Sequence, residues 1–182
     1  MKKSKIKTQD ICSIAIMTAV TAVMAQISIP MPLGVPMTMQ TFAITLAAVI
    51  LGSKRGALSI FIYVLLGAIG VPVYANFSGG FQNLVGPTGG FLLSFPIMAF
   101  VIGLGMKYRK KKGMFALFLI LGTVLNYVVG VLMFCVITQS SVMAGISACV
   151  LPFIPTAIIK AVLASVLGFQ IRDRLAATEQ WA

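Results

Sequence analysis

The sequence predicts an all-α integral membrane protein with six transmembrane helices, both termini in the cytoplasm and ordered, Gly/Pro-rich external loops. Two observations support this fold class. Hydrophobic residues make up 59% of the 182 residues and charged residues only 9%, with a mean hydropathy of +1.05. Such a composition excludes a soluble domain of this length, which would need a polar surface. In addition, basic and uncharged connections alternate along the chain.

The charges show this alternation directly. All but one of the 14 Lys and Arg residues lie in or beside four short stretches: residues 2–7, 54–55, 107–112 and 172–174. No charge occurs in the intervening connections: residues 28–39, 72–90 and 138–145. The positive-inside rule places the basic stretches and both termini in the cytoplasm, which requires an even number of spans in the cell membrane. Anionic lipid, not nucleic acid, then explains the net charge of +11.

We predict a single membrane domain, residues 1–182. Its spans are expected at residues 10–29, 39–52, 57–71, 91–106, 114–137 and 146–170. The first is expected to be a retained span and not a cleaved signal peptide. The second is short of the about 20 residues that a straight span needs and could be a re-entrant hairpin. The alternating charges favour a short or oblique crossing, because otherwise every later basic loop would change sides.

The connection at residues 72–90 combines a turning backbone with aromatic rings and neutral amides. It contains five glycines and two prolines, and also Tyr74, Phe77 and Phe81. A merely flexible linker would lack such aromatics. The combination favours a loop that folds over a small, flat, polar ligand. The alternative is an external connector that packs its own aromatics against the bundle.

Lys160 is the one basic residue within a long apolar run. It lies about ten residues, or about 15 Å, from the cytoplasmic end of the last span, too far to reach water easily. Inserting such a lysine costs about 2.5–3.5 kcal/mol, so an unused one should be rare. The acids, Asp10, Asp173 and Glu179, lie at or beyond the ends of the first and last spans. A neutral lysine, backbone oxygens near the proline break, or a ligand remain as explanations, and we favour the ligand.

Missing residue types exclude several functions. The chain has no His, no pair of carboxylates within the spans, no phosphate-binding loop and no cysteine beside a base. The side chains that hydrolysis, metal binding and ATP binding require are therefore missing, so we expect no enzyme activity, no cofactor and no metal. The lack of acids in the spans also argues against proton or sodium coupling.

Two further features admit structural or functional interpretations. Alanines recur at helical spacing in the first span and leave a smooth face, which from spacing alone favours packing within the chain. Asn126, near the middle of the fifth span, needs a partner in hydrocarbon, and we expect it to hold helices together and not to bind ligand. Pro152 and Pro155 should break the helix near the outer end of the last span.

Short motifs recur along nearly the whole chain. They are VPMTMQT at residues 35–41, GAL at 56–58, LLGA at 65–68, GVPV at 70–73 and GPTGGF at 86–91. Each motif is weak alone, but their order and spacing are specific. In these motifs the sequence resembles the BioY family, the biotin-specific S components of energy-coupling-factor (ECF) vitamin transporters.

The resemblance implies a six-helix bundle that binds biotin from outside, beneath the external loops. It also implies a transmembrane scaffold subunit and two cytoplasmic ATPases as partners, with docking on the scaffold through Ala15 and Ala19. That implication moves the interpretation of the alanine face toward docking. The family carries an acid three residues before the lysine, where this chain has Ala157. The amides of the 72–90 connection would then cover the ureido ring of biotin, and Lys160 would bind a carbonyl or the carboxylate of the ligand.

We therefore predict biotin contacts from the loops, the rim and the last span. The expected residues are Asn76, Phe77, Gln82, Asn83, Gly86, Thr88, Gln40, Thr41, Thr156 and Lys160. One alternative is an S component for a different vitamin, which Ala157 makes plausible. The other is a non-transport membrane scaffold or channel, although a channel would need more polar groups along its spans than Lys160 and Asn126 provide.

Overall fold

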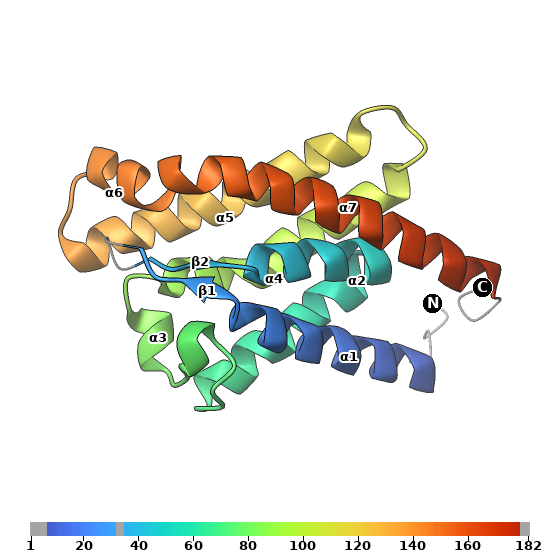
Figure 1. Ribbon diagram of the computed structural model, residues 1–182, viewed down its shortest axis with the longest axis horizontal. Coiled ribbons are helices and arrows are strands. Elements are labelled where there is room, and N and C mark those ends of the chain that lie inside the picture. Colours follow the sequence, from blue (N-terminus) through green and yellow to red (C-terminus); the bar gives the residue numbers. More distant parts are fainter. Residues whose placement is uncertain (1–6, 32–34, 179–182) are drawn as a thin grey trace, which may run out of the picture.

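The computed structural model describes residues 7–31 and 35–178. Within these residues, five helical stretches are long and apolar enough to cross a membrane: Thr8–Ala25, Gln40–Ala68, Gly89–Tyr108, Met114–Thr138 and Val142–Ala177. They lie lengthwise as one bundle (Figure 1), which confirms the predicted all-α membrane fold. The beginning of the first basic stretch, with Lys2, Lys3 and Lys5, and the acid Glu179 lie outside the described residues.

Helix α2 (Gln40–Ala68) contains the second and third predicted spans and folds back on itself at Gly52. Gly52 has φ +79° and ψ −172°, a conformation that glycine adopts readily because it lacks a Cβ atom. The side-chain amide of Gln40 donates a 2.6 Å hydrogen bond to the hydroxyl of Tyr63. In a straight helix these residues would be about 35 Å apart. The two halves of α2 therefore run in opposite directions, as the charge pattern predicts for two successive spans.

The first connection explains why helix α1 (Thr8–Ala25) ends before position 29, where the first span was predicted to end. Ser28–Ile29 form strand β1, which pairs antiparallel with strand β2 (Met37–Thr38). The paired strands satisfy their backbone groups across the connection, so these residues leave the helix. Strand β2 leads directly into α2, and its position fixes one side of the cavity described below.

The second connection is ordered and partly helical. It contains the 3₁₀ turn η1 (Ala75–Phe77) and the short helix α3 (Gln82–Val85). Helix α2 ends at Ala68, before the predicted boundary at position 71, and helix α4 (Gly89–Gly105) begins earlier than predicted. A further 3₁₀ turn, η2 (Met106–Tyr108), leads through the basic loop to helix α5 (Met114–Thr138).

The last predicted span, residues 146–170, is interrupted in the structure. Its region forms helix α6 (Val142–Cys149), the turn η3 (Leu151–Phe153) and helix α7 (Ile154–Ala177). Pro152 lies in η3 and Pro155 in the first turn of α7, where the missing N–H of proline needs no helical partner. The expected break is present, but the long helix begins only after it and continues past position 170.

Helix α2 forms the centre of the bundle, with α1, α4 and α7 packed around it. Tyr63 and Ile60 of α2 and Met98 of α4 are among its fully buried side chains. In contrast, α5 and α7 expose large apolar side chains, such as Leu132 at 56% and Ile158 at 60%. An apolar outer surface of this kind is expected where helices face lipid.

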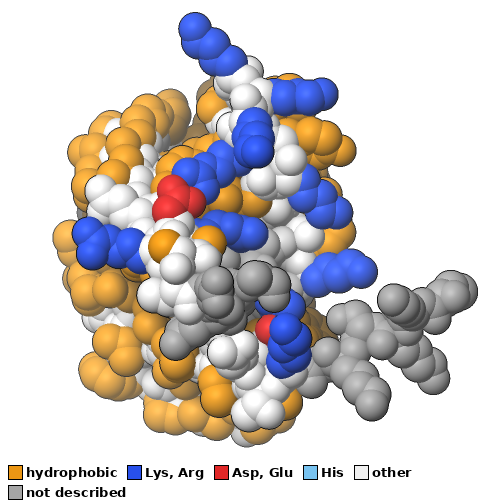
Figure 2. Space-filling model, turned by 90° about the vertical axis from the view of Figure 1, so that its right-hand side faces the viewer, with side chains coloured by type: hydrophobic (Ala, Val, Ile, Leu, Met, Phe, Trp, Pro, Cys, Tyr) orange, Lys and Arg blue, Asp and Glu red, His pale blue; other side chains and the backbone are white. Residues whose placement is uncertain are grey.

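Basic side chains gather at the end of the bundle that holds both ends of the described chain (Figures 1 and 2). Among them, Arg55 pairs with Asp10 at 3.0 Å, and Arg109 binds Asp173 through two N–O contacts of 2.6 Å. The basic stretches that the charge pattern assigns to one side of the membrane therefore lie together. The opposite end carries β1, β2, α3 and α6 (Figure 1).

Candidate functional site

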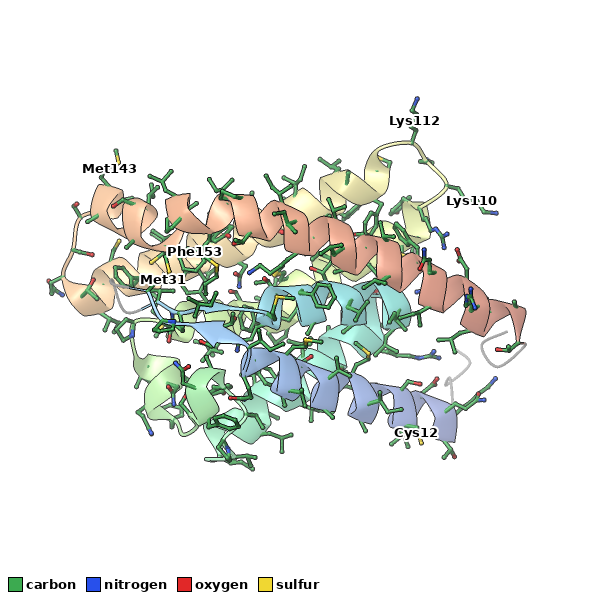
Figure 3. All side chains as sticks on the ribbon, in the orientation of Figure 1. Cys12, Met31, Lys110, Lys112, Met143 and Phe153 are labelled. Atoms are coloured by element: carbon green, nitrogen blue, oxygen red, sulfur yellow. The ribbon has the colours of Figure 1, made fainter. Side chains whose placement is uncertain are left out.

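A cavity of about 280 Å³ opens at the end of the bundle opposite the basic side chains. Its volume is close to the lower end of the range of about 300–1,000 Å³ that is typical of small-molecule sites. Its lining comes from β2, the start of α2, the 72–90 connection, α4, α5 and the α6–α7 break. Phe153 lines it from this break and belongs to a buried apolar cluster against which Met31 of the β1–β2 connection packs; both side chains are labelled in Figure 3.

Lys160 extends from α7 into this cavity. Its Nζ donates a 2.9 Å hydrogen bond to the backbone oxygen of Thr38 in β2. A backbone oxygen is thus its partner, but that oxygen belongs to the strand and not to the proline break. Thr38 also donates through Oγ1 to Oε1 of Gln40 at 2.8 Å, and Gln40 in turn donates to Tyr63. The lysine is therefore bonded to a hydrogen-bond network of Thr38, Gln40 and Tyr63. Its ammonium group has two further N–H donors that can bind a ligand.

Gln26, just after α1, holds the 72–90 connection in place. Its Nε2 donates to the backbone oxygens of Val73 and Tyr74 at 3.3 and 3.1 Å, and its Oε1 accepts from the Phe77 N–H at 2.8 Å. These three contacts hold the backbone of the connection between Val73 and Phe77. Within that turn, the left-handed conformation of Asn76, with φ +57°, is one that asparagine tolerates better than most residues.

Tyr74 anchors the base of the same connection. Its hydroxyl donates a 2.6 Å hydrogen bond to the backbone oxygen of Val64, and its ring meets Tyr63 edge to face with 5.7 Å between centroids. The ring occupies space that a side chain on Gly67 would fill. Burial raises the pKa of Tyr74 to about 12. The connection is therefore packed into the bundle and is not a flexible linker.

Aromatic rings from the helices form much of the cavity wall. Phe91 and Phe95 of α4, Tyr127 of α5 and Phe153 line it. Phe91 and Tyr127 meet edge to face at 6.5 Å, and Gly130 leaves room for the Phe91 ring. The sequence analysis did not include these rings among the candidate contacts. The aromatic that follows the glycine pair of the GPTGGF motif was the available signal.

Asn126 connects α4 and α5, as predicted. Its Nδ2 donates to the backbone oxygen of Phe91 at 3.1 Å and to Oγ of Ser94 at 2.8 Å. The residue is 3% exposed, so these contacts remove the penalty for a buried amide without a partner. Asn126 also borders the cavity, which means that it holds one wall in position.

Six of the predicted contact residues meet at the cavity although they come from three parts of the chain. They are Gln40, Thr41, Asn76, Asn83, Thr88 and Lys160. The structure does not bring Phe77, Gln82, Gly86 or Thr156 to its lining. The Phe77 side chain is 72% exposed. The amide of Gln82 donates to the Gly79 oxygen at 3.0 Å, and Oγ1 of Thr156 donates to the Phe153 oxygen at 3.0 Å.

Contacts with the backbone accompany three of these four differences. We expected polar and aromatic side chains of the connection to contact the ligand. In the structure, local hydrogen bonds to backbone oxygens engage Gln82 and Thr156. Phe77 has a left-handed backbone with φ +53°, its N–H binds Gln26, and its ring is exposed. The cavity receives its aromatic rings from helices instead.

A separate apolar groove of about 480 Å³ runs between α1 and the second half of α2. Ala15 and Ala19 lie in this groove and are exposed. Leu58, Ile62 and Leu66 form its other side. No helix in the described part of the chain covers these alanines, so packing within the chain does not account for their small size.

An apolar bundle whose end cavity combines one lysine, neutral amides, hydroxyls and aromatic rings defines a membrane-embedded binding protein for a small molecule. Among the described residues, no group of three His, Cys, Asp or Glu side chains could hold a metal ion. Comparison with known families identifies the particular family within this class of protein. The chain belongs to the BioY family, whose model matches residues 1–177.

Individual relatives agree with this assignment. The chain is 42% identical over 160 residues to the "Biotin transporter BioY" of Thermotoga maritima, covering 86% of this chain and 92% of that protein. It is 48% identical over 99 residues to the "Probable biotin transporter BioY" of Pyrococcus horikoshii. The latter match spans 54% of this chain and 60% of the length of that relative.

A solved structure supports the fold. The crystal structure of "the S-component for biotin from an ECF-type ABC transporter" superposes with a TM-score of 0.83 at 28% sequence identity, covering 95% of both chains. The family predicted from the motif order is thereby confirmed, together with the helical membrane architecture.

Proposed function

We propose that this protein captures biotin as the membrane substrate-binding subunit, or S component, of an ECF-type vitamin transporter. The observation that carries the proposal is the cavity in a BioY-family chain, where Lys160 and the amides of Asn76 and Asn83 meet aromatic rings from α4 and α5. Such a lining suits a molecule that carries a polar ring, an apolar middle and a carboxylate.

The donors and acceptors match the chemistry of biotin. Its ureido ring has one carbonyl acceptor and two N–H donors, and its side chain ends in a carboxylate. The Asn76 amide can donate and accept, and Oδ1 of Asn83 can accept although its Nδ2 already donates to the Gly79 oxygen at 2.8 Å, so both side chains suit the ring. Lys160 then donates to a carbonyl or the carboxylate. Ala157, at the position of the family's acid, does not line the cavity, so in this chain the loop amides take over ring recognition.

Apolar contact completes the site. Phe91, Phe95 and Tyr127 present ring surface to the cavity, and aromatic side chains bury large areas with little loss of conformational entropy. They would cover the thioether ring and the aliphatic chain of biotin. Exclusion of water by these rings also strengthens the hydrogen bonds of Lys160 and the amides.

The membrane orientation follows from charge. Six spans would place the basic end, both termini and the basic loops in the cytoplasm of a plasma-membrane protein. The cavity, at the other end of the bundle, would then open to the outside, beneath the 72–90 connection. Biotin would enter from outside and be held by the connection that Gln26 fixes.

Transport needs partners, because the sequence contains no phosphate-binding loop for ATP. We infer that a transmembrane scaffold subunit and two cytoplasmic ATPases supply the driving force, and that this chain acts as a transporter subunit and not as an enzyme. The groove around Ala15 and Ala19 is the proposed docking face for a scaffold helix. Exposed small residues allow the close helix approach that drives association in lipid.

Titration calorimetry on the detergent-solubilised protein tests the proposal, with biotin, thiamine and riboflavin as separate titrants. We expect a heat of binding with biotin and none with thiamine or riboflavin. Binding of another vitamin in place of biotin would favour a changed specificity, for which Ala157 is the motivating residue. No heat with any vitamin, from protein shown to be folded, would contradict vitamin capture and support a non-transport scaffold.

A further inference from the structure

A second cavity, of about 320 Å³, lies at the basic end of the bundle, at the corner where α2 turns back. Four cationic residues from α2, η2 and α7 line it: Lys54, Arg55, Lys107 and Arg172. No carboxylate is among the described residues of its lining. The corner itself is formed by Gly52 and Ser53, and it is far from the proposed biotin cavity at the other end.

Close backbone packing gives this corner a fixed shape. A Cβ atom on Gly103 of α4 would lie only 2.5 Å from the backbone nitrogen of Ser53, so α4 can approach only because position 103 is glycine. The second half of α2 begins at this corner, and the N-terminus of a helix carries a partial positive charge. The cations thus surround a rigid backbone turn and are not spread along a mobile loop.

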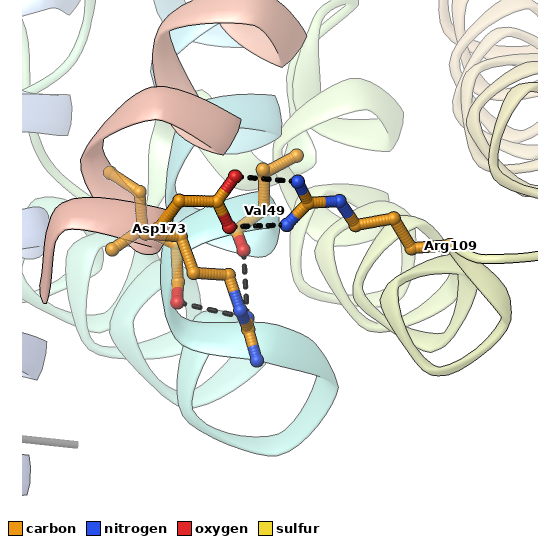
Figure 4. Close-up of polar contacts among 5 residues, drawn as sticks. Val49, Arg109 and Asp173 are labelled. Atoms are coloured by element: carbon orange, nitrogen blue, oxygen red, sulfur yellow. Dashed lines mark hydrogen bonds and ion pairs between the residues drawn. The ribbon is translucent and has the colours of Figure 1, made fainter. Parts of the chain in front are cut away.

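Arg172 is held in position by the same turn. Its Nη1 donates to the backbone oxygens of Val49 and Ile50 at 2.9 and 3.0 Å, both in the last helical turn before Gly52. Figure 4 shows the Val49 carbonyl beside the pair of Asp173 and Arg109. A guanidinium has five N–H donors, so this anchoring through one nitrogen leaves others for a ligand.

The described acids at this end offset the charge of the cavity only in part. Asp173 binds Arg109 through both carboxylate oxygens, a contact that raises the pKa of the Arg109 guanidinium. Asp10 pairs with Arg55. Neither carboxylate lines the cavity. Lys54, Lys107 and Arg172 have no carboxylate within ion-pair distance in the described part of the chain, and an anion placed between them would relieve their mutual repulsion.

We propose that this cavity binds the phosphate of an anionic phospholipid headgroup. The location favours a lipid over a free anion, because Lys107 lies two residues beyond the end of the apolar helix α4. Lipid phosphates lie at this level of a membrane, where the hydrocarbon ends. Leu51 and Met106 add an apolar wall beside the cations, as contact with the glycerol and upper acyl region requires. The site would fix the α2 corner to one leaflet.

Native mass spectrometry on the purified whole protein can test this site. The probe is phosphatidylglycerol, compared with phosphatidylcholine of the same acyl chains and with inorganic phosphate. The test variant is Lys54→Gln with Lys107→Gln, both exposed residues of the cavity rim. The matched control is Lys110→Gln with Lys112→Gln, which removes equal charge from a loop where the two lysines extend away from the bundle (Figure 3).

We expect wild type and control to retain phosphatidylglycerol, and the test variant to bind it at least about tenfold more weakly. Circular dichroism and size-exclusion chromatography check that both variants are folded. Equal weakening in both variants would show diffuse charge attraction and overturn the proposal. So would equal retention of phosphatidylcholine, or equally tight binding of inorganic phosphate, which would assign the cavity to a free anion.

Discussion

The side-chain oxygen of Gln26 accepts a 2.8 Å hydrogen bond from the backbone N–H of Phe77, 51 residues further along the chain. The same side chain donates to two carbonyls of the 72–90 connection. Gln26 directly follows α1, which carries Ala15 and Ala19. The helix with the proposed docking groove is therefore bonded directly to the connection that covers the proposed biotin site, so a shift in one would alter the other.

Gln26→Ala should weaken biotin binding by about 5- to 30-fold, because the connection would have to become ordered when the ligand binds. Titration calorimetry with biotin measures the change. Gln82→Ala is the matched control, since its amide contacts only the Gly79 oxygen within the connection and lies outside the cavity. The control should stay within about twofold of wild type. Equal losses in the two variants would remove Gln26 from this role.

Ala19→Leu should disrupt assembly with the scaffold subunit while biotin binding stays unchanged. The larger side chain fills the apolar groove beside α2 and prevents close helix approach. Co-purification of the scaffold and ATPases with a tagged variant measures assembly. Ala116→Leu on α5, an exposed position away from the groove, is the control and should assemble normally. Full assembly of Ala19→Leu would place the docking face elsewhere.

Tyr63→Phe should lower the free energy of unfolding by about 1–3 kcal/mol, because it leaves the buried Gln40 amide without its acceptor. Unfolding by denaturant in detergent, followed by circular dichroism, measures this change. Tyr108→Phe is the matched control, since that ring is 41% exposed and stacks on Phe118 without using its hydroxyl. The control should change stability by less than about 0.5 kcal/mol. A Tyr63 variant as stable as wild type would mean that the network contributes nothing to holding α2 folded back.

The sequence predicted features that depend on composition, on charged connections and on helix-breaking residues. Uncharged and basic connections indicated which ends of the helices lie together, and the charges around Lys54 and Arg55 indicated that a short second span turns back there. Pro152 and Pro155 indicated a helix break. The exact limits of the last helix were missed because hydropathy remains high through α6, η3 and α7, so an apolar window cannot separate them.

Site residues that depend on long-range contacts were harder to predict. At the cavity, Lys160 bonds to Thr38, which is 122 residues away in the sequence, and no local sequence pattern predicts such a pair. The aromatic residues of the connection drew attention to Phe77, yet its ring is exposed while its backbone N–H binds Gln26. The rings that do line the cavity, including Phe95 and Tyr127, lie in apolar helices, where an aromatic looks like ordinary core.

The most direct test of the account is the affinity for biotin of Lys160→Met beside Thr156→Val, measured by titration calorimetry. Thr156 lies one helical turn from Lys160 and outside the cavity lining, so it reports damage to α7 alone. We predict that Lys160→Met weakens binding by about 10- to 150-fold, the range expected for loss of a charge-assisted hydrogen bond. Thr156→Val should bind like wild type. Unchanged affinity in Lys160→Met would contradict the assignment of this cavity as the biotin site.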